Sequence, residues 1–460
     1  MANNVEEKDV KIGLEIHGYL QTQEKLFCRC KAERHTSDKP NTNICPICTG
    51  QPGCKPMLPN SEAIKKIIQI GLMLGCKINS SFVWQRKHYD WPDLPKGFQT
   101  TISGSYSIPV GEKGNFEKIG ITEVHLEEDP ASWNPETGCI DYNRSGLPLV
   151  EIVTEPDFSN SEEVAEWIKK LLLVLAYIKA VDKNAGLKAD VNVSINQKAG
   201  GNRVEIKNIS SIEDIKAAIE YEIQRQEKEG TQLETRRWTG EKTEKMRGKE
   251  EAADYRFIPE PDLPIIKLEK TRIDKLKSEL PETPQEKLNK LIKKHKIDKK
   301  SAEILHRNFE LVEFFEKVSE KISPDFALSW VTIELLRVLN YNKKTLEEVD
   351  IKPEHFIELL EAVKSKKITE LKAKQILNSF VPKSHSISQE LKSSERITNE
   401  KEIEKFVLQV LAKNKQACED FRAGKKESLN FLLGEIMKAS NRRADFSASK
   451  TILLKLLKAH

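Results

Sequence analysis

The sequence has no apolar run long enough to form a membrane-spanning helix. Its most apolar stretch, Leu171 to Ile178, is far shorter than the roughly 18 residues that a membrane-spanning helix needs. The initial segment, MANNVEEKDV, is polar and acidic, unlike a secretory signal or an Arg-rich transit peptide. We therefore expect a soluble, cytoplasmic protein without membrane contact.

The Gly-rich phosphate loop is also missing. No G-x-x-x-x-G-K-S/T motif occurs, and the segment GEKGNFEKIG does not match it, which excludes a P-loop NTPase. A strong net charge is absent too, since 75 Lys and Arg residues face 71 Asp and Glu residues. This balance permits a polyanionic partner but does not indicate one.

The cysteines do not suit a disulfide scaffold, because only eight occur in 460 residues and four of them cluster near the start. Cys28 and Cys30 form one close pair, and Cys45 and Cys48 form another. Two such pairs can enclose one ion in a tetrahedron of four sulfurs, the geometry of structural zinc. Four unrelated buried thiols are the alternative, which the doubled spacing disfavours.

The length of the chain suggests roughly two to four domains. Before residue 285, short strand-like alternations are separated by Gly, Pro and Asn turns; after it, nearly everything has helical periodicity. Two polar, proline-containing stretches, 278–287 and 381–389, suit linkers. The predicted domains are 1–288, 289–390 and 391–460.

Three helix starts are visible in the first part of the chain, and Ser61 opens the first of these helices. Ser159 and Glu162 have the spacing of a capping box before an apolar helical stripe. Ser211 and Asp214 open a third helix, which is predicted to end at Gly230.

Four segments alternate between apolar and polar residues, as strands with one buried face do. In KIGLEIHGYL, for example, Leu14 and Ile16 lie on one face, with Glu15 and His17 on the other. The segments ITEVHLEEDP, LKADVNVSIN and NRVEIKNIS divide in the same way. Their polar faces carry His125, Glu127, Asp129, Asp190, Asn192, Ser194, Asn196, Arg203, Glu205 and Lys207.

Any one of these segments is most simply a half-buried strand with its polar face in water. Four together, presenting Glu, Asp, Asn and His with Lys and Arg nearby, favour another interpretation. If the strands share one sheet, that surface is a hard-oxygen site for Mg²⁺ surrounded by cationic groups. Such a site suits phosphoryl transfer, which depends mostly on positioning and charge neutralisation.

Two further segments, Arg86 to Gln99 and Asp254 to Pro264, mix prolines, aromatic residues and paired charges. Prolines lower the entropy cost of holding a loop in one shape. One hypothesis is that their charges are held over a site; two ordinary surface connections are the alternative. The charged residues concerned are Lys87, Lys96, Arg256, Glu260 and Asp262.

Taken in order, these segments resemble a known family. The series is GLEIHGYL, the two cysteine pairs, RKHYDWPDLPKGFQ, VHLEEDP, DYNRSGLPLVEIVTEPD, ADVNVSI, VEIKNISS, ETRRW and DYRFIPEPDLP. Over nearly the whole chain it resembles the GatB family, the B subunits of the glutamyl/aspartyl-tRNA amidotransferases. The end of the chain resembles the YqeY-like domain of that family, and the cysteine pairs resemble those of its zinc-bearing members.

The resemblance implies an α+β fold. It consists of an N-terminal cradle on an antiparallel sheet, similar to glutamine synthetase, then an all-helical middle domain and a small helical tail domain that binds tRNA. The implied reaction uses ATP to phosphorylate the side-chain carboxylate of Glu-tRNA(Gln) or Asp-tRNA(Asn), after which ammonia displaces phosphate. The implied cofactors are ATP, Mg²⁺ and a structural Zn²⁺. The implied partners are the amidase (A) and small (C) components of the same complex and the misacylated tRNA.

Residue by residue, the resemblance also implies a site. It places the ligands of Mg²⁺ and of the ATP phosphates at Glu15, His17, Glu127, Glu128 and Asp190. By alternation, however, Glu128 points away from Glu127 unless a bulge turns it.

Five more residues are candidates on the same grounds. Glu151 lies in a similar strand block and is a further possible ligand. Lys87 is a candidate for steadying a carboxylate or phosphate. The candidates for contacts to the ATP phosphates are Arg203, Lys207 and Arg256.

The chain departs from the family pattern in places. Asn196 stands where the family usually has Arg, which leaves the contact of that Arg in doubt. Phe257 and Ile258 replace Tyr and Phe without removing a charge. Lysine runs on the C-terminal helices usually indicate a solvated face, but the resemblance favours contacts to tRNA phosphates.

Two alternatives come from other functional classes. One is a non-catalytic tRNA-binding scaffold, which the intact set of acidic and His residues disfavours. The other is a free-standing carboxylate–amine ligase, which the basic C-terminal helices disfavour. No amidase signature such as a Ser-Ser-Lys set is present, so ammonia is expected from a partner. The sequence does not distinguish Glu-tRNA(Gln) from Asp-tRNA(Asn) as the substrate.

Overall fold

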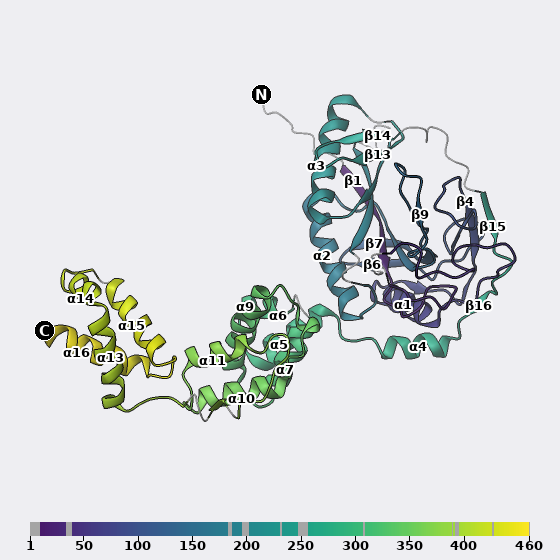
Figure 1. The fold of residues 1–460 in the computed structure, drawn as a ribbon. Helices are drawn as coiled ribbons and strands as arrows, with labels where there is room; N and C mark the ends of the chain where they lie inside the picture. Colours follow the sequence, from purple (N-terminus) through teal and green to yellow (C-terminus); the bar gives the residue numbers. More distant parts are fainter. Residues whose placement is uncertain are drawn as a thin grey trace. The chain divides into compact units, whose positions relative to one another are not determined.

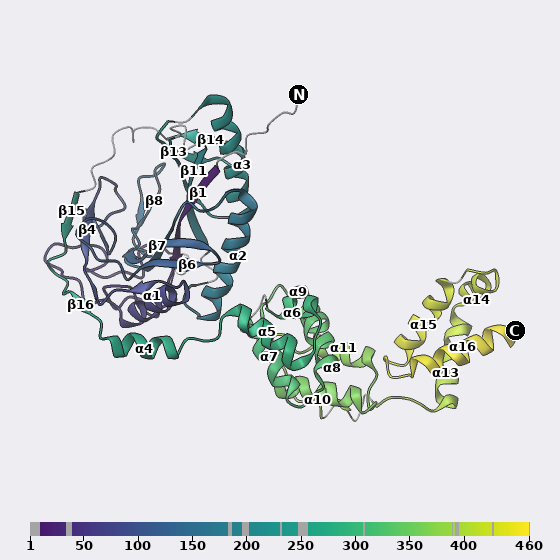
Figure 2. The ribbon, with the colours of Figure 1, turned by 180° about the vertical axis from the view of Figure 1, so that it is seen from behind.

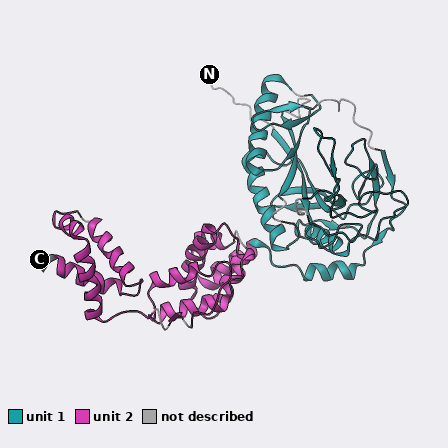
Figure 3. Cartoon of the chain, in the orientation of Figure 1, with its two compact units in different colours: residues 1–284 teal, residues 285–460 magenta. Residues whose placement is uncertain are grey.

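A computed structural model describes residues 10–33, 39–182, 186–195, 202–230, 232–246, 256–306, 309–388, 390–391, 395–425 and 427–459. The prediction about Asn196 lies outside these residues. The chain divides into two compact units, residues 1–284 and 285–460, coloured separately in Figure 3. Unit 1 is built on a large sheet and unit 2 is helical, so the α+β prediction is confirmed.

Unit 1 contains a sheet of twelve strands among the described residues, in the order β14-β13-β12-β11-β1-β10-β7-β5-β4-β15, with β2 and β6 off this path. All pairs are antiparallel except β12 with β13, which run parallel, a departure from the purely antiparallel expectation. The strands are β1 (Val10–Tyr19), β2 (Lys77–Ile78), β3 (Ser81–Phe82), β4 (Gln85–His88), β5 (Gln99–Thr101), β6 (Gly111–Phe116), β7 (Ile119–Glu128), β8 (Ser132–Trp133), β9 (Ile140–Asp141), β10 (Pro148–Thr154), β11 (Leu187–Ile195), β12 (Val204–Ile209), β13 (Glu234–Trp238), β14 (Thr243–Lys245), β15 (Arg256–Pro259) and β16 (Ile266–Lys267).

The four alternating segments of the sequence form β1, β7, β11 and β12 of this one sheet, as their interpretation required. Their apolar residues, such as Leu14, Ile16, Val124 and Val191, are buried in a single core. The helices α1, α2 and α3 supply the other side of that core, and Figures 1 and 2 show α2 and α3 along one face of the sheet. The polar residues of the four strands therefore face the opposite side.

The helices of unit 1 begin close to where the sequence predicts. The cap of α2 differs by one residue, because the Asn160 side chain accepts from the Glu163 backbone N–H. The carboxylate of Glu163 accepts in turn from the Ser159 backbone N–H at 2.9 Å, so the predicted box of Ser159 and Glu162 is wrong in register. Ser211 caps α3 and Gly230 ends it, as predicted. These helices are α1 (Ser61–Met73), α2 (Ser161–Tyr177), α3 (Ile212–Glu229) and α4 (Lys270–Ser278).

Strand β12 carries a bulge opposite Asp190. Ala189 of β11 pairs with Ile209, but Val191 pairs with Ile206, so two residues of β12, Lys207 and Asn208, oppose one residue of β11. Asn208 adopts a positive φ of 58° there. The bulge breaks the strict alternation of β12 at this point.

Unit 2 has two hydrophobic clusters, one formed by residues from Leu288 to Ile387 and one from Ile397 to Leu457. A π-helical stretch, Trp330–Leu335, joins α8 to α9. Along the described chain, no helix is both long and apolar enough to cross a membrane. The helices are α5 (Pro284–His295), α6 (Lys299–His306), α7 (Phe309–Ser319), α8 (Pro324–Ser329), α9 (Leu336–Tyr341), α10 (Pro353–Lys364), α11 (Glu370–Asn378), α13 (Glu400–Lys413), α14 (Lys415–Arg422), α15 (Glu427–Ala439) and α16 (Phe446–Ala459).

Candidate active site

A cavity of about 600 Å³ opens on the polar face of the sheet. Polar side chains of β1, β7, β11 and β12 contribute its floor, because alternation turns their apolar neighbours toward the helices. The segments that follow β4 and β7 contribute its walls. Five predicted site residues line it: His17, Lys87, Glu127, Asp190 and Lys207.

His17, Glu127 and Glu151 form one cluster, and the first two of these residues line the cavity. Strand register explains their meeting. His17 of β1 lies opposite Glu151 of β10, and Glu127 of β7 lies opposite Leu149, which is two residues from Glu151 on the same face of β10. The Nε2 atom of His17 lies 3.7 Å from a carboxylate oxygen of each glutamate. One donor atom from each residue lies within 4.8 Å of the others.

A fourth residue, His125, contacts the Glu151 carboxylate of this cluster. It is buried, with Nε2 3.1 Å from Glu151 Oε2 and Nδ1 3.5 Å from Glu123 Oε2. Burial lowers the pKa of His125, but the two carboxylates outweigh it and raise the pKa to about 10. Burial likewise raises the pKa of Glu151, yet the charge and hydrogen bond of His125 bring it well below its usual range.

The donor set of the cluster fits a divalent cation. Burial, followed by the nearby charge of Glu151, raises the pKa of Glu127, so this carboxylate lacks full compensation for its charge. A bound cation would supply that compensation. Two carboxylates suit Mg²⁺ or Mn²⁺, and an imidazole is a common ligand of first-row metals.

Glu15, Asp190 and Glu205 form a second acidic cluster, with one oxygen of each within 4.8 Å of the others. Glu15 and Asp190 are register partners on β1 and β11. The Nζ atom of Lys207 donates to Asp190 Oδ2 at 2.7 Å and to Glu205 Oε1. Burial lowers the pKa of Lys207, but the charges of Asp190 and Glu205 raise it above its usual range. An ammonium group therefore already lies among these carboxylates.

A smaller cavity of about 320 Å³ lies beside the second cluster and has both Glu15 and Arg203 in its lining. Asn192 Nδ2 donates to Glu15 Oε1 at 3.1 Å. Burial raises the pKa of Glu15, although Lys207 acts in the opposite direction. Glu15 and Arg203 thus border this neighbouring space rather than the main cavity.

Two predicted site residues, Glu128 and Arg256, are not brought to the others. Glu128 points away from Glu127, as alternation requires, and its Oε1 accepts from Lys96 and from the Thr100 backbone N–H. Arg256 is exposed on the edge strand β15 and lines neither cavity. Glu128 and Arg256 therefore line neither cavity in this structure.

The two proline-rich segments contact each other, and several of their charged side chains form ion pairs between the segments. Arg86 donates to Glu260 at 2.8 and 2.9 Å and to Asp262 at 3.0 Å, which ties β4 to the segment after β15. Only Lys87 of the five charges proposed to lie over a site lines the main cavity. Glu260 and Asp262 pair with Arg86 instead, and Lys96 pairs with Glu128.

The sequence analysis named Asp129 on a polar strand face but missed two residues that contact it at the cavity wall, Tyr19 and Arg144. Tyr19 Oη donates to Asp129 Oδ2 at 2.9 Å, and Arg144 Nε lies 3.0 Å from the same oxygen. All three residues line the cavity. Tyr19 follows His17 by one full alternation, so the strand pattern contained that signal. Arg144 lies in a loop without periodicity, and nothing in its local sequence points to the site.

The four paired cysteines gather as predicted, with their sulfur atoms within 4.8 Å of one another. Cys28 and Cys48 are buried. Hydrogen bonding with Cys28 lowers the pKa of Cys48 to about 5, and the buried Lys25 places Nζ 3.6 Å from the Cys48 sulfur. Four thiolates at this spacing fit a closed tetrahedral zinc site. The set is Cys28, Cys30, Cys45 and Cys48.

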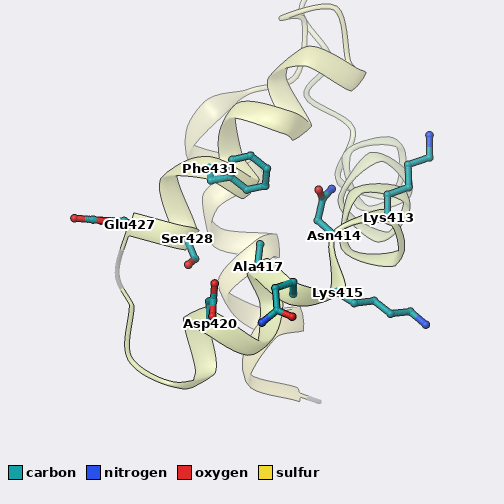
Figure 4. Close-up of a pocket in the computed structure, with 9 residues that line it drawn as sticks. Lys413, Asn414, Lys415, Ala417, Asp420, Glu427, Ser428 and Phe431 are labelled. Carbon is teal, nitrogen blue, oxygen red and sulfur yellow. The ribbon is translucent and has the colours of Figure 1, made fainter.

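Unit 2 has a separate hollow of about 520 Å³ between α14 and α15. Figure 4 shows Phe431 and Ser428 of α15 opposite Ala417 and Asp420 of α14, with the side chain of Lys415 extending outward. Phe431 is half exposed. This hollow has no cluster of potential metal ligands among the described residues, which separates it from the cavity of unit 1.

Comparison with known proteins gives this geometry a family. The GatB/GatE catalytic domain matches residues 10–274, and the GatB domain that carries the YqeY fold matches residues 313–457. The chain belongs to the GatB family. The catalytic-domain match contains every site residue predicted from the sequence, the cysteines included. The second match begins well before the predicted tail boundary at 391.

Named members of the GatB family are similar to this chain from end to end. The B subunit of the aspartyl/glutamyl-tRNA(Asn/Gln) amidotransferase of Methanococcus maripaludis is 40% identical, covering 98% of this chain and 99% of its own length. The proteins of the same name from Methanocaldococcus jannaschii and Methanothermobacter thermautotrophicus are 40% and 41% identical, covering 97% and 95% of this chain and 97% of their own lengths. The resemblance to this family is confirmed, as is its classification as one component of an amidotransferase.

Proposed function

We propose that this chain uses ATP to activate the side-chain carboxylate of glutamate or aspartate esterified to tRNA, so that ammonia can amidate it. The observation that most supports this proposal is the meeting of His17, Glu127 and Glu151 at a cavity that is lined by His17 and Glu127 and also by Lys87 and Lys207. Related proteins are named as subunits of a tRNA-dependent amidotransferase. A polar cavity with a divalent-cation donor set and ammonium groups suits phosphoryl transfer to a carboxylate.

In the first step, a carboxylate oxygen of the substrate attacks the γ-phosphorus of ATP. The bond from that phosphorus to the β,γ-bridging oxygen breaks, which yields an acyl phosphate and ADP. A divalent cation held by His17, Glu127 and Glu151 supplies neutralisation of phosphate charge when it is bound. Lys87 orients the attacking carboxylate, and Lys207 of β12 faces the phosphates from the same cavity. Arg203 borders the neighbouring cavity and is left without a role in this step.

In the second step, ammonia attacks the carbonyl carbon of the acyl phosphate. The bond from carbon to the phosphate oxygen breaks, and phosphate leaves with one proton from the nitrogen, so that an amide remains. A free carboxylate is a poor acceptor for ammonia, and the phosphoryl group gives it a leaving group. The ammonia comes from glutamine on the amidase (A) component, joined to this chain together with the small (C) component.

Unit 2 would bind the body of the tRNA. Its lysines lie on exposed helix faces, where ammonium groups can contact phosphates without reading sequence. The three domains 1–288, 289–390 and 391–460 remain part of this proposal. The two hydrophobic clusters of unit 2 are consistent with a boundary near residue 390.

The test is amidation by this chain, co-expressed with its amidase partner, with ATP and Mg²⁺. Glu-tRNA(Gln) and Asp-tRNA(Asn) would each be supplied, with glutamine or ammonium chloride as the nitrogen donor. His17→Ala and Asp190→Ala would be compared with the unaltered chain. Product with both donors, lost in both variants, is the expected outcome. Bound tRNA without product from ammonium would instead favour a non-catalytic scaffold.

A further inference from the structure

Trp91 is an exposed aromatic residue on the wall of the main cavity of unit 1, and the proposed reaction gives it no role. It follows β4 in the first of the two proline-containing segments, and it is 46% exposed. Of the large hydrophobic side chains that are exposed along the described chain, Trp91 alone lines this cavity. The rest of the lining is mostly charged or polar, so the cavity combines an aromatic surface with ionic groups. Exposed apolar surface of this kind commonly marks a binding site.

Contacts within its own segment and beyond it hold Trp91 in place. Its backbone carbonyl accepts from the Leu94 backbone N–H at 3.3 Å, which closes a turn. The Asp93 carbonyl accepts from the Ala131 backbone N–H at 2.9 Å, which ties this turn to the segment after β7. The rings of Trp91 and Trp133 meet edge to face, with 5.8 Å between their centroids. The ring is thus held before a ligand arrives, which lowers the entropy cost of stacking a ligand on it.

The lining of the cavity suits a ligand that has both phosphate groups and an aromatic base. It includes the ammonium groups of Lys87 and Lys207, which the proposed reaction assigns to the substrate carboxylate and the phosphates. A nucleobase presents a flat π surface that stacks on an exposed aromatic side chain. ATP contains adenine, and so does the terminal nucleotide of tRNA, which carries the amino acid. An adenine ring is therefore the chemistry that matches Trp91.

We propose that Trp91 stacks on the adenine of one of these two substrates and so positions that substrate in the cavity. This role of Trp91 rests on the proposed function, which brings ATP and aminoacyl-tRNA to the cavity. Trp91 is a binding residue and takes no part in making or breaking bonds. ATP and tRNA offer the same ring, so probes with and without adenine are needed to identify its source.

Equilibrium binding to the full chain in complex with its partner proteins tests this role. The ATP arm compares the non-hydrolysable analogue AMP-PNP with inorganic tripolyphosphate, both with Mg²⁺. The tRNA arm compares tRNA(Gln) with the same tRNA lacking its terminal adenosine. Trp91→Ala should weaken the binding of one adenine-bearing probe by about 5- to 100-fold and leave the matching probe without adenine unchanged. The adenine-bearing probe that responds identifies the source of the base.

Trp91→Phe keeps an aromatic ring and should largely restore the binding. Tyr106→Ala removes an exposed aromatic residue of unit 1 that lines neither cavity, and should bind every probe like the unaltered complex. Unchanged affinity of Trp91→Ala for both adenine-bearing probes would overturn the inference, as would an equal loss for a probe and its counterpart without adenine. An unaltered complex that binds no AMP-PNP would instead overturn the proposed use of ATP, and the tRNA arm would then decide the role of Trp91.

Discussion

Units 1 and 2 differ in whether their charged side chains are buried or exposed. Among the described residues, every buried charged side chain lies in unit 1, between Lys25 and Glu260. The buried polar side chains of unit 2 are a threonine and three serines. Burying a charge costs several kcal/mol of folding free energy unless partners compensate it. The buried charges therefore lower the stability of unit 1, and unit 2 does not carry this cost.

The difference follows from what each unit is built of. The strands of one sheet bring side chains from distant segments to one face, so that His17 of β1 can meet Glu127 of β7 across the intervening strand β10. Helices of unit 2 turn their charges outward, and some of these charges pair with neighbours three or four residues away, as Lys344 pairs with Glu348. A sheet can thus assemble a buried site, and the helical unit presents a charged surface.

The largest expected effect tests the cost of buried charge in unit 1. Glu222 is fully buried and accepts from Arg225 Nη2 at 2.7 Å and from Thr243 Oγ1 at 2.8 Å. Glu222→Ala leaves Arg225 without its main partner and should lower the free energy of unfolding by about 3–5 kcal/mol. Denaturant unfolding measures this, with Glu227→Ala on the exposed side of α3 as the control. Equal losses for the two variants would contradict the comparison.

The second prediction concerns the role of buried charge in activity. Glu127→Gln removes a charge from the cation site while preserving its shape, and should lower the amidation rate by about 10²–10³-fold. The amidation rate with ammonium chloride would be measured, and the circular dichroism spectrum is expected to be unchanged. Glu313→Gln, at an exposed position of unit 2, should retain the activity. A similar decrease for Glu313→Gln would mean that unit 2 carries chemistry.

The third prediction concerns Lys25, a buried lysine beside the cysteine cluster. Its Nζ also donates to the Asn43 carbonyl at 3.0 Å, so the ammonium group is fixed beside the sulfur of Cys48. Lys25→Met should weaken zinc binding by about 10- to 100-fold, measured by competition with a chelating dye. The exposed Lys31 lies next to Cys30, and Lys31→Met should bind zinc like the unaltered chain. Equal zinc affinity in Lys25→Met and the unaltered chain would show that the Lys25 charge does not contribute to zinc binding.

The smallest effect is expected for an ion-pair group of unit 2. Glu334 pairs with Arg337 at 2.9 Å and with Lys374 at 2.7 Å, and both partners are more than a third exposed. Glu334→Ala should therefore lower the free energy of unfolding by less than about 1 kcal/mol, measured in the same denaturant series. A cost near that of Glu222→Ala would erase the distinction between the two units.

The sequence predicts the strand faces well because alternation is a local property. Leu14 and Glu15 fall on the predicted sides, and the same holds along β7, β11 and β12. The choice between Ser159 and Asn160 as the cap of α2 was wrong because both residue types cap helices, and only backbone geometry separates them.

Contacts between distant segments could not be predicted in this way. Arg86 and Glu260 are 174 residues apart, and no periodicity links them. Lys96 and Glu128 also pair across a long separation, which the sequence does not show. The sequence therefore suggested Lys96 as a charge held over a site and Glu128 as a ligand, and did not pair them. The site could be predicted where strands carry it, and could not where loops carry it.

The bulge in β12 gives Asp190 two donors that a regular strand cannot combine. Neighbouring residues of a strand point to opposite faces, yet here the Lys207 ammonium and the Asn208 backbone N–H reach the same carboxylate. The second donor belongs to the main chain, so no side-chain substitution can delete it directly. It depends on the left-handed conformation at position 208, which Asn and Gly adopt readily and β-branched residues do not. Among descendants of this sequence, position 208 should accept glycine more readily than valine, although its own side chain is not the donor.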